Sequence, residues 1–334
     1  MRSLVTGASG FIGRRLASAL ARRGDRVVCL VRPTSDVRPL QALSVELVRG
    51  DLGLPDSLGR AAAGADRVFH LAGTIQAADE AAFDSANVLG TRNLVEACLR
   101  APSRPGRFVF VSSIAAAGPS PAGKPLTEAD EPRPVSAYGR SKLAAERLVL
   151  EAGAAMPVTV VRPPNVLGPG SKELEAAARL LRRGLMPSFG SAGTRTSLID
   201  VDDLVAALIL AAESPLSAGR TYFVTDGRDY GWPEVAAAVA EAYGRPRFSV
   251  KVPFWLQLLA ARLEEAAAGH SGRQPRLTRE IVRAARDHSW VYDGSRIERE
   301  LGFRAKYGLR ESVRRAAEGS RSADEGRAGR EEGR

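Results

Sequence analysis

The sequence predicts an α/β fold with a doubly wound parallel sheet. Short runs with β-strand character alternate with helical patterns along residues 1–162. These runs are apolar almost throughout, which is typical of strands covered by helices on both faces. Regular alternation of strand and helix indicates βαβ units with right-handed crossovers. We expect strands at Ser3–Thr6, Arg26–Val31, Val45–Val48, Arg67–Leu71, Arg107–Ser112 and Val158–Arg162, with amphipathic helices such as Phe11–Arg23 and Phe83–Leu99 between them.

The pattern changes after Pro163, where connectors rich in proline and glycine appear. They separate expected helices near Lys172–Arg183, Asp203–Glu213 and Trp232–Tyr243 and an expected strand at Thr221–Val224. This arrangement predicts a smaller cap built beside the sheet, with part of its chain returning to the sheet. We therefore expect a first domain at residues 1–165 and a cap at 166–318. Residues 319–334 are rich in Gly, Arg and Glu and are expected to form a disordered tail.

The overall composition limits the class of protein. The chain has 334 residues, of which 44% are hydrophobic, and it can bury a substantial core. Its net charge of +10 comes mostly from arginines scattered among acids, so we expect no nucleic-acid partner. No apolar run approaches the roughly 20 residues that span a bilayer. Because the N-terminus also lacks a signal-peptide pattern, we expect a cytoplasmic protein without a membrane span.

Cysteine and histidine residues give no sign of a disulfide or a metal site. Cys29 and Cys98 each lie inside an apolar or helical run, which favours buried thiols. His70, His270 and His288 are far apart and have no metal-ligand spacing. We expect no metal.

One helical stretch has two interpretations. Residues Phe254–Ala268 are apolar on one side, which is compatible with a helix on a membrane surface. Their polar side carries Arg262, Glu264 and Glu265, and we favour a helix that lines the core or a pocket.

The segment Thr6-Gly7-Ala8-Ser9-Gly10-Phe11-Ile12-Gly13 follows the first expected strand and opens the first expected helix. Glycines allow a tight turn and a close approach of the backbone to a pyrophosphate, and the helix N-terminus offers N–H groups and partial positive charge. This strand–turn–helix context predicts a Rossmann-type domain that binds a nicotinamide dinucleotide.

Two residues further along bear on the choice of cofactor. Arg32 stands at the end of the second strand, where an acidic residue would bind the ribose 2′-hydroxyl of NAD. A guanidinium suits the 2′-phosphate of NADP, so NADP is preferred, with NAD as the alternative. Asp51 follows the third strand and is placed to accept a hydrogen bond from the adenine amino group, unless it is a simple turn aspartate.

Three side chains indicate acid–base chemistry. Tyr138 and Lys142 stand four residues apart on an expected helix that Ser136 can cap, and this spacing puts both on one face. A neighbouring ammonium lowers the pKa of a phenol, which makes the tyrosine a better acid–base group. Ser113 ends the fifth expected strand, where its hydroxyl can hydrogen-bond the substrate oxygen that Tyr138 protonates.

With these motifs the chain resembles an extended short-chain dehydrogenase/reductase. This group includes nucleotide-sugar epimerases, dehydratases and dihydroflavonol- or 3β-hydroxysteroid-type dehydrogenases. Besides the glycine turn, the matching segments are Gly50-Asp51-Leu52, His70-Leu71-Ala72-Gly73, Asn87-Val88-Leu89-Gly90-Thr91, Ser112-Ser113, Tyr138 with Lys142, Arg162-Pro163-Pro164-Asn165-Val166 and Ile199-Asp200-Val201-Asp202-Asp203. They cover about residues 1 to 318.

The resemblance implies roles for individual residues. Ser113, Tyr138 and Lys142 form the implied catalytic set, and His70 has an implied structural role. The candidate cofactor-binding residues are Gly7, Ser9, Gly10, Phe11, Ile12, Gly13, Arg32, Asp51, Leu52, Leu71, Ala72, Tyr138, Lys142, Pro163 and Asn165. The pair Asp202-Asp203 is implied to cap a helix, and Asp200 replaces a histidine that is usual in the family. A homodimer paired through the helix that carries Tyr138 is compatible with the resemblance.

Residues that are missing narrow the reaction. Residues Ile114–Ala117, which follow Ser113, contain no acid or base, whereas related dehydratases and decarboxylases carry acids in this region. We expect an NAD(P)-dependent oxidoreductase that moves a hydride between nicotinamide and a secondary alcohol or ketone. The apolar segment Val252–Leu259 favours a hydrophobic small-molecule substrate. A nucleotide-sugar 4-epimerase with tightly bound NAD is the alternative, with Arg195 as a candidate contact for the sugar diphosphate. A non-catalytic nicotinamide-binding protein is a third reading.

Overall fold

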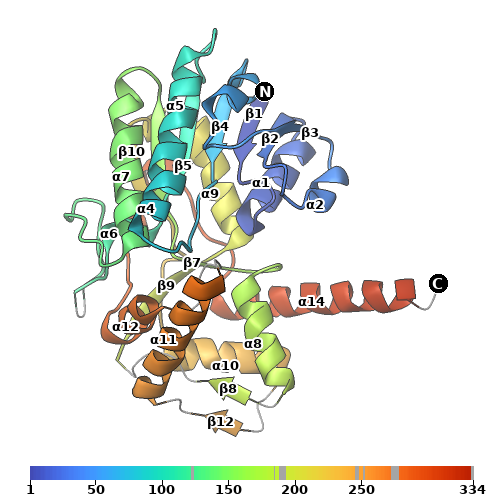
Figure 1. Ribbon diagram of the computed structural model, residues 1–334, viewed down its shortest axis with the longest axis vertical. Coiled ribbons are helices and arrows are strands. Elements are labelled where there is room, and N and C mark those ends of the chain that lie inside the picture. The colour runs from blue at the N-terminus through green and yellow to red at the C-terminus, as the bar shows by residue number, and fades with distance from the viewer. Residues whose placement is uncertain are drawn as a thin grey trace.

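The core of the molecule is a seven-stranded parallel sheet in the order β10-β6-β5-β4-β1-β2-β3 (Figure 1). The computed structural model describes residues 1–121, 124–183, 185–187, 193–244, 248–250, 253–271 and 278–331. The strands are β1 (Arg2–Thr6), β2 (Arg26–Val31), β3 (Val45–Arg49), β4 (Arg67–His70), β5 (Arg107–Val111), β6 (Val158–Arg162) and β10 (Arg220–Phe223). The predicted doubly wound parallel fold is confirmed, and the first six strands follow the order expected of a dinucleotide-binding sheet.

Helices cover both faces of this sheet, as its apolar strands require. On one face, α1 (Phe11–Arg22), α9 (Val201–Glu213) and α13 (Ser295–Leu301) bury residues such as Leu16, Leu204 and Ile297. The other face is covered by α3 (Gly59–Ala62), α5 (Gly90–Arg100) and α7 (Ala137–Glu151). Short helices α2 (Arg38–Gln41), α4 (Glu80–Phe83) and α6 (Ile114–Ala117), and a π-helical stretch at Asp84–Leu89 before α5, complete this part.

A second, smaller part of the molecule lies beyond the carboxyl ends of the parallel strands (Figure 1). Its three-stranded sheet consists of β7 (Asn165–Leu167), β9 (Arg195–Asp200) and β11 (Asp229–Gly231), and β8 (Leu185–Pro187) pairs with β12 (Phe248–Val250). Its helices are α8 (Lys172–Arg182), α10 (Trp232–Tyr243), α11 (Phe254–Ser271), α12 (Arg279–Asp287) and α14 (Leu309–Glu331). Because α9 packs on the large sheet and β10 is one of its strands, the chain crosses between the two parts more than once.

The C-terminal segment differs from expectation. Residues beyond 318 were expected to be disordered, but α14 continues to Glu331, and residues 332–334 lie outside the described range. The helix is anchored at its start, where Leu309, Val313 and Ala316 are buried in the small part. Arg, Glu and Ala are strong helix formers, so the anchored helix extends outward from the molecule (Figure 1).

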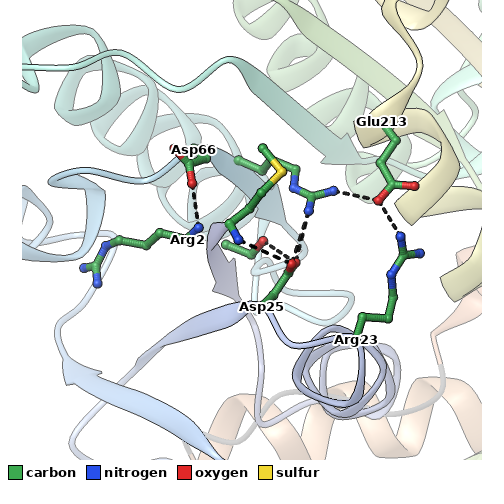
Figure 2. Close-up of polar contacts among 8 residues, drawn as sticks. Arg2, Arg23, Asp25, Asp66 and Glu213 are labelled. Atoms are coloured by element: carbon green, nitrogen blue, oxygen red, sulfur yellow. Dashed lines mark hydrogen bonds and ion pairs between the residues drawn. The ribbon is translucent and has the colours of Figure 1, made fainter.

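A partly buried ion network lies at the end of the sheet opposite the glycine turn (Figure 2). Arg67 at the start of β4 donates to Asp25 (3.1 Å) and to Glu213 (3.1 Å) at the end of α9. Glu213 also accepts from Arg23, and Asp25 accepts from Ser3. These contacts fix α9 and the end of α1 to the strands, so both helices are held in place far from the glycine turn.

Two further properties follow from burial and length. Cys29 and Cys98 are buried free thiols, and burial raises the pKa of each to about 12. In the described part of the chain, none of the helices combines the length and the apolar character needed to cross a membrane.

Candidate active site

The glycine turn has the shape of a phosphate-binding cradle. Gly7 follows β1 with φ +69°, and the Gly10 N–H donates to the Gly7 carbonyl (2.9 Å). A Cβ on Gly7 would lie 2.8 Å from the Ala72 nitrogen, and one on Gly13 would collide with the Gly7 carbonyl oxygen. Gly10 precedes α1 without a side chain to cap it, which leaves the first-turn N–H groups for a ligand. These features fit the pyrophosphate of a dinucleotide.

A chain of hydrogen bonds through His70 fixes the loop beside this cradle. The Thr91 hydroxyl donates to the Asn87 carbonyl (2.6 Å), so His70 Nε2 must donate to Thr91 (2.9 Å). His70 Nδ1 then accepts from the Thr6 hydroxyl (2.7 Å), which accepts in turn from the Ala72 N–H (3.1 Å). Burial and the charge of Lys142 lower the pKa of His70 to about 3. His70 is therefore a neutral residue inside the fold, placed between β1 and the start of α5.

Tyr138 and Lys142 lie in the first two turns of α7, as predicted. Ser136 is the N-cap and accepts from the Gly139 N–H (2.9 Å). Lys142 is buried, and its Nζ donates to the Val111 carbonyl (2.8 Å) above the Phe110 ring (4.2 Å). Removal of the ammonium from water lowers the pKa of Lys142 to about 8. The lysine thus meets the C-terminal end of β5.

Ser113 follows β5 by two residues and contacts the tyrosine at the same place. Its hydroxyl oxygen caps α6 by accepting from the Ala115 N–H (3.1 Å). It also hydrogen-bonds Tyr138, which favours the phenolate, but burial outweighs this effect and raises the pKa of Tyr138 to about 12. The three candidate catalytic residues therefore converge on the end of β5, and the phenol keeps its proton at neutral pH.

Asn87 is connected to the backbone of Tyr138 through Ser141, a role that the sequence did not predict. Its amide nitrogen donates to Ser141 Oγ (2.9 Å) and to the Thr74 carbonyl (3.0 Å), and its amide oxygen accepts from the Thr74 N–H (2.8 Å). Ser141 in turn donates to the Tyr138 carbonyl (2.8 Å). Asn87 belongs to a motif that the resemblance had singled out, so a signal for it was present.

A buried ion pair below Lys142 was also missed. Glu146, one turn further along α7, accepts two hydrogen bonds from Arg162 at the end of β6 (2.9 and 2.6 Å). Both side chains are buried, and Glu146 favours the charged form of Lys142. The spacing of Lys142 and Glu146 puts them on one helical face, but nothing in the sequence pairs Glu146 with Arg162.

The remaining candidate cofactor residues surround the same edge of the sheet. Arg32 is exposed at the end of β2, and Leu71 and Ala72 are half-buried after β4. Asp51 is half-buried and accepts from the Gly53 N–H (2.8 Å), which is the geometry of a turn aspartate. Other positions are Ser9, Phe11 and Ile12, half-buried in the turn and α1; Leu52, whose carbonyl accepts from Asn93 (2.7 Å); Pro163, whose carbonyl accepts from the Ile114 N–H (3.1 Å); and Asn165, exposed at the start of β7.

The acidic residues at the start of α9 require a correction. The expected cap, Asp202-Asp203, lies in the first turn, and the N-cap is Asp200, which accepts from the Asp202 N–H (2.8 Å). Asp200 is buried and forms an ion pair with Arg315 of α14 (2.9 Å), and Arg315 also contacts Asp202. Asp203 instead accepts two backbone N–H groups before α14, from Lys306 and Tyr307 (both 2.9 Å). These acids therefore hold α14 against α9.

Comparison with known proteins agrees with this geometry. The model of the NAD dependent epimerase/dehydratase family matches residues 3–224. A ceramide reductase of Caulobacter vibrioides is 35% identical over 75% of this chain and 73% of its own length. A 4-hydroxy-2-methyl-3-oxo-4-farnesyl-3,4-dihydroquinoline-1-oxide ketoreductase of Stigmatella aurantiaca is 33% identical over 91% and 92% of the two chains.

A solved structure extends the similarity to nearly the whole fold. The UDP-glucose 4-epimerase of Thermus thermophilus, in complex with NAD, matches with a TM-score of 0.78 and 26% identity, and the match covers 97% of this chain and all of that one. The chain belongs to the NAD dependent epimerase/dehydratase family and is an NAD(P)-dependent enzyme of the extended short-chain dehydrogenase/reductase type.

Proposed function

We propose that this enzyme reduces a ketone on a lipophilic substrate to a secondary alcohol, with NADPH as the hydride donor. The protonated state of Tyr138 carries this proposal. Its pKa of about 12 keeps the proton on the phenol until a more basic oxygen forms beside it. The alkoxide that develops when a ketone is reduced is such an oxygen.

Each residue at the end of β5 has its own role in this reduction. The dihydronicotinamide, when bound, supplies the hydride to the carbonyl carbon. Ser113 holds the carbonyl oxygen, and Tyr138 transfers its proton to that oxygen, which leaves a phenolate. The ammonium of Lys142, whose pKa is about 8, stabilises the phenolate at neutral pH. Because residues 114–117 contain no acid or base, the site has no further group there for an elimination step.

The surroundings of Arg32 support NADPH. Arg32 is exposed at the end of β2, and its side chain has no acidic partner in the described part of the chain. The nearby Asp36 carboxylate is held by Arg38 (2.8 Å), so its charge is offset. A free guanidinium at this place fits a 2′-phosphate, which presents two negative charges to it.

The small part of the molecule is proposed to form the substrate-binding cap, and a lipophilic substrate fits its chemistry. Arg195, which had been the candidate contact for a sugar diphosphate, instead contacts the Asp229 side chain and carbonyl, with Glu234 at 3.9 Å. An arginine engaged in this way is less available to a diphosphate. The two reductases compared above are named for a ceramide and for a farnesyl-bearing quinoline oxide, both largely hydrocarbon.

A 4-epimerase remains the second candidate, because the chain matches the Thermus thermophilus epimerase over nearly its full length. Transient oxidation and re-reduction of a sugar need the same tyrosine, lysine and serine, together with a cofactor that stays bound. The cofactor retained after gentle purification separates the two. Stoichiometric NAD supports the epimerase, whereas exchangeable NADPH supports the reductase.

The direct test is oxidation of NADPH in the presence of long-chain ketones, with Tyr138→Phe as the variant. We expect kcat to fall by about 10²- to 10⁴-fold, because a general acid is lost, with little change in NADPH affinity. Tyr307→Phe is the matched control, since Tyr307 lies against Arg315 in a ring contact that a phenylalanine retains. Unchanged turnover in Tyr138→Phe would exclude the proposed acid.

A further inference from the structure

The outward face of α11 is largely apolar, which fits the less favoured of the two interpretations of this helix. Trp255, Leu256, Leu259 and Leu263 are 66, 41, 43 and 62% exposed. These four account for more than a third of the eleven large hydrophobic residues that are exposed in the described chain, and they lie on one helix. An exposed apolar cluster of this kind is typical of a surface that binds another protein or a membrane.

The side of α11 that faces the protein carries both apolar and polar residues: Ala261 is buried and Leu258 is half-buried. Glu265 is half-buried and pairs with Arg279 of α12 (2.8 Å), while Gln257 and Glu264 are half-buried and engaged in contacts of their own. At the other end of the hairpin, Arg286 of α12 stacks on the Phe254 ring (3.9 Å). The helix is therefore held by the buried Ala261, by Phe254 and by the polar residues on its inward side. We had expected the apolar side to line the core or a pocket; the buried Ala261 fits that expectation, whereas Trp255, Leu256, Leu259 and Leu263 are exposed.

Exposed arginines without a carboxylate partner in the described ranges lie on the same two helices. Arg262 projects from the exposed side of α11, and Arg283 and Arg286 are exposed on α12. Within the described ranges, none of these three arginines contacts a carboxylate, whereas many other arginines of this protein form ion pairs. A surface that offers both apolar groups and anionic groups complements the exposed residues of these two helices.

We propose that α11 docks on the surface of a lipid bilayer that contains anionic headgroups. A helix with tryptophan and leucine on one side and arginine beside them lies in the interface, where the apolar side chains enter the acyl boundary. The stem of Arg262 can lie along the apolar face while its guanidinium reaches a phosphate. A second copy of this chain is a poorer fit, because it carries the same arginines and the same net charge of +10.

The docking helix lies close to the candidate active site. Glu280 of α12 accepts a hydrogen bond from the Ala137 N–H (3.2 Å), the residue before Tyr138. The hairpin of α11 and α12, seen side by side in Figure 1, therefore connects the apolar surface to the first turn of α7. The docking itself does not depend on the proposed reaction.

Sedimentation with vesicles tests the proposal on the full chain. The vesicles are phosphatidylcholine alone, or phosphatidylcholine with about one third phosphatidylglycerol. We expect the protein to sediment with the anionic vesicles only and added salt to weaken binding. Leu263→Glu should reduce partitioning roughly tenfold or more, because a charge replaces a leucine that would enter the bilayer. Leu216→Glu is the matched control, since Leu216 is 63% exposed, lies outside the hairpin and changes the net charge equally.

Three outcomes overturn the proposal. The first is a wild-type protein that does not bind anionic vesicles. The second is equal loss of binding in Leu263→Glu and Leu216→Glu, which would reflect net charge alone. The third is a stable dimer that Leu263→Glu dissociates, without vesicle binding, because a second copy would then cover the helix. Tyr138→Phe should bind vesicles like the wild type, so failure of the proposed reaction would leave this result unchanged.

Discussion

Gly139 packs directly against Ala115, and this contact sets how closely α7 approaches α6. A Cβ on Gly139 would collide with the Ala115 carbonyl oxygen, which is backbone and cannot rotate away. Tyr138 precedes Gly139 on α7, and Ser113 is the N-cap of α6. The distance between the two hydroxyl groups therefore depends on a glycine that touches neither of them.

Gly139→Ala should separate the tyrosine from the serine. We expect overpacking to cost about 1–3 kcal/mol of stability, and kcat to fall while the affinity for NADPH is kept. Thermal unfolding and steady-state kinetics measure both effects. Gly59→Ala is the control, because Gly59 lies in a helix with nothing within 4 Å of a new Cβ. A Gly139→Ala variant with wild-type kcat and stability would show that α6 and α7 can move apart freely.

The ionisation of Lys142 predicts an alkaline limit to the reaction. Its pKa is lowered to about 8 by burial, so the ammonium is charged at neutral pH and is lost as pH rises through that value. We expect kcat/KM to decline by up to tenfold per pH unit above about 8, because the neutral amine no longer stabilises the phenolate.

Lys142→Arg separates this effect from other titrations. A guanidinium stays charged over the whole range, so the decline above pH 8 should disappear even though the altered shape lowers the overall rate. If the alkaline decline persists in Lys142→Arg, another group is responsible for it.

Local sequence patterns could identify much of this site, because each of its parts is short. The glycine turn, the Ser136 cap and the spacing of Tyr138 and Lys142 all lie within single helices or turns, whose geometry follows from a few adjacent residues. The parallel sheet was predictable for the same reason, since apolar runs of strand length recur at regular intervals.

Relationships across long distances were not predictable. The Asp200 carboxylate pairs with Arg315, which lies in another helix far along the chain, and no spacing rule connects the two. The sequence of α11 predicted an apolar side and a polar side, but apolar residues lie both on its inward side, at Ala261, and on its outward side, at Trp255. The orientation of the helix depends on its contacts with α12. Arg279 and Arg286 bind Glu265 and the Phe254 ring, and so they turn Trp255 outward.

Arg32→Ala tests the proposed preference for NADPH. Loss of a charge-assisted hydrogen bond to the 2′-phosphate should raise KM for NADPH by about 10- to 100-fold. KM for NADH should change little, because NADH has no phosphate there. Arg38→Ala is the control, since Arg38 is exposed nearby but is held by Asp36. Equal changes for both cofactors in Arg32→Ala would mean that the guanidinium does not read the phosphate.

The buried His70 predicts a specific form of acid sensitivity. Its pKa is about 3 in the folded protein and 6.5 in the unfolded chain, so between these values only the unfolded chain takes up the proton. The stability that depends on neutral His70 is fully present above pH 6.5 and is lost as pH falls below it. Each pH unit removes up to about 1.4 kcal/mol.

The measurement compares the wild type with His70→Gln. Both proteins have the same carboxylates, so the titration of these groups affects both alike. Urea unfolding at several values between about pH 4.5 and 7.5 gives the difference in stability between the two proteins. Above pH 6.5 this difference should be constant, because His70 is neutral in both the folded and the unfolded state. Below it the difference should shrink, because only the wild type has a buried imidazole that must stay unprotonated to fold. A difference that does not depend on pH would mean that His70 can be protonated inside the fold.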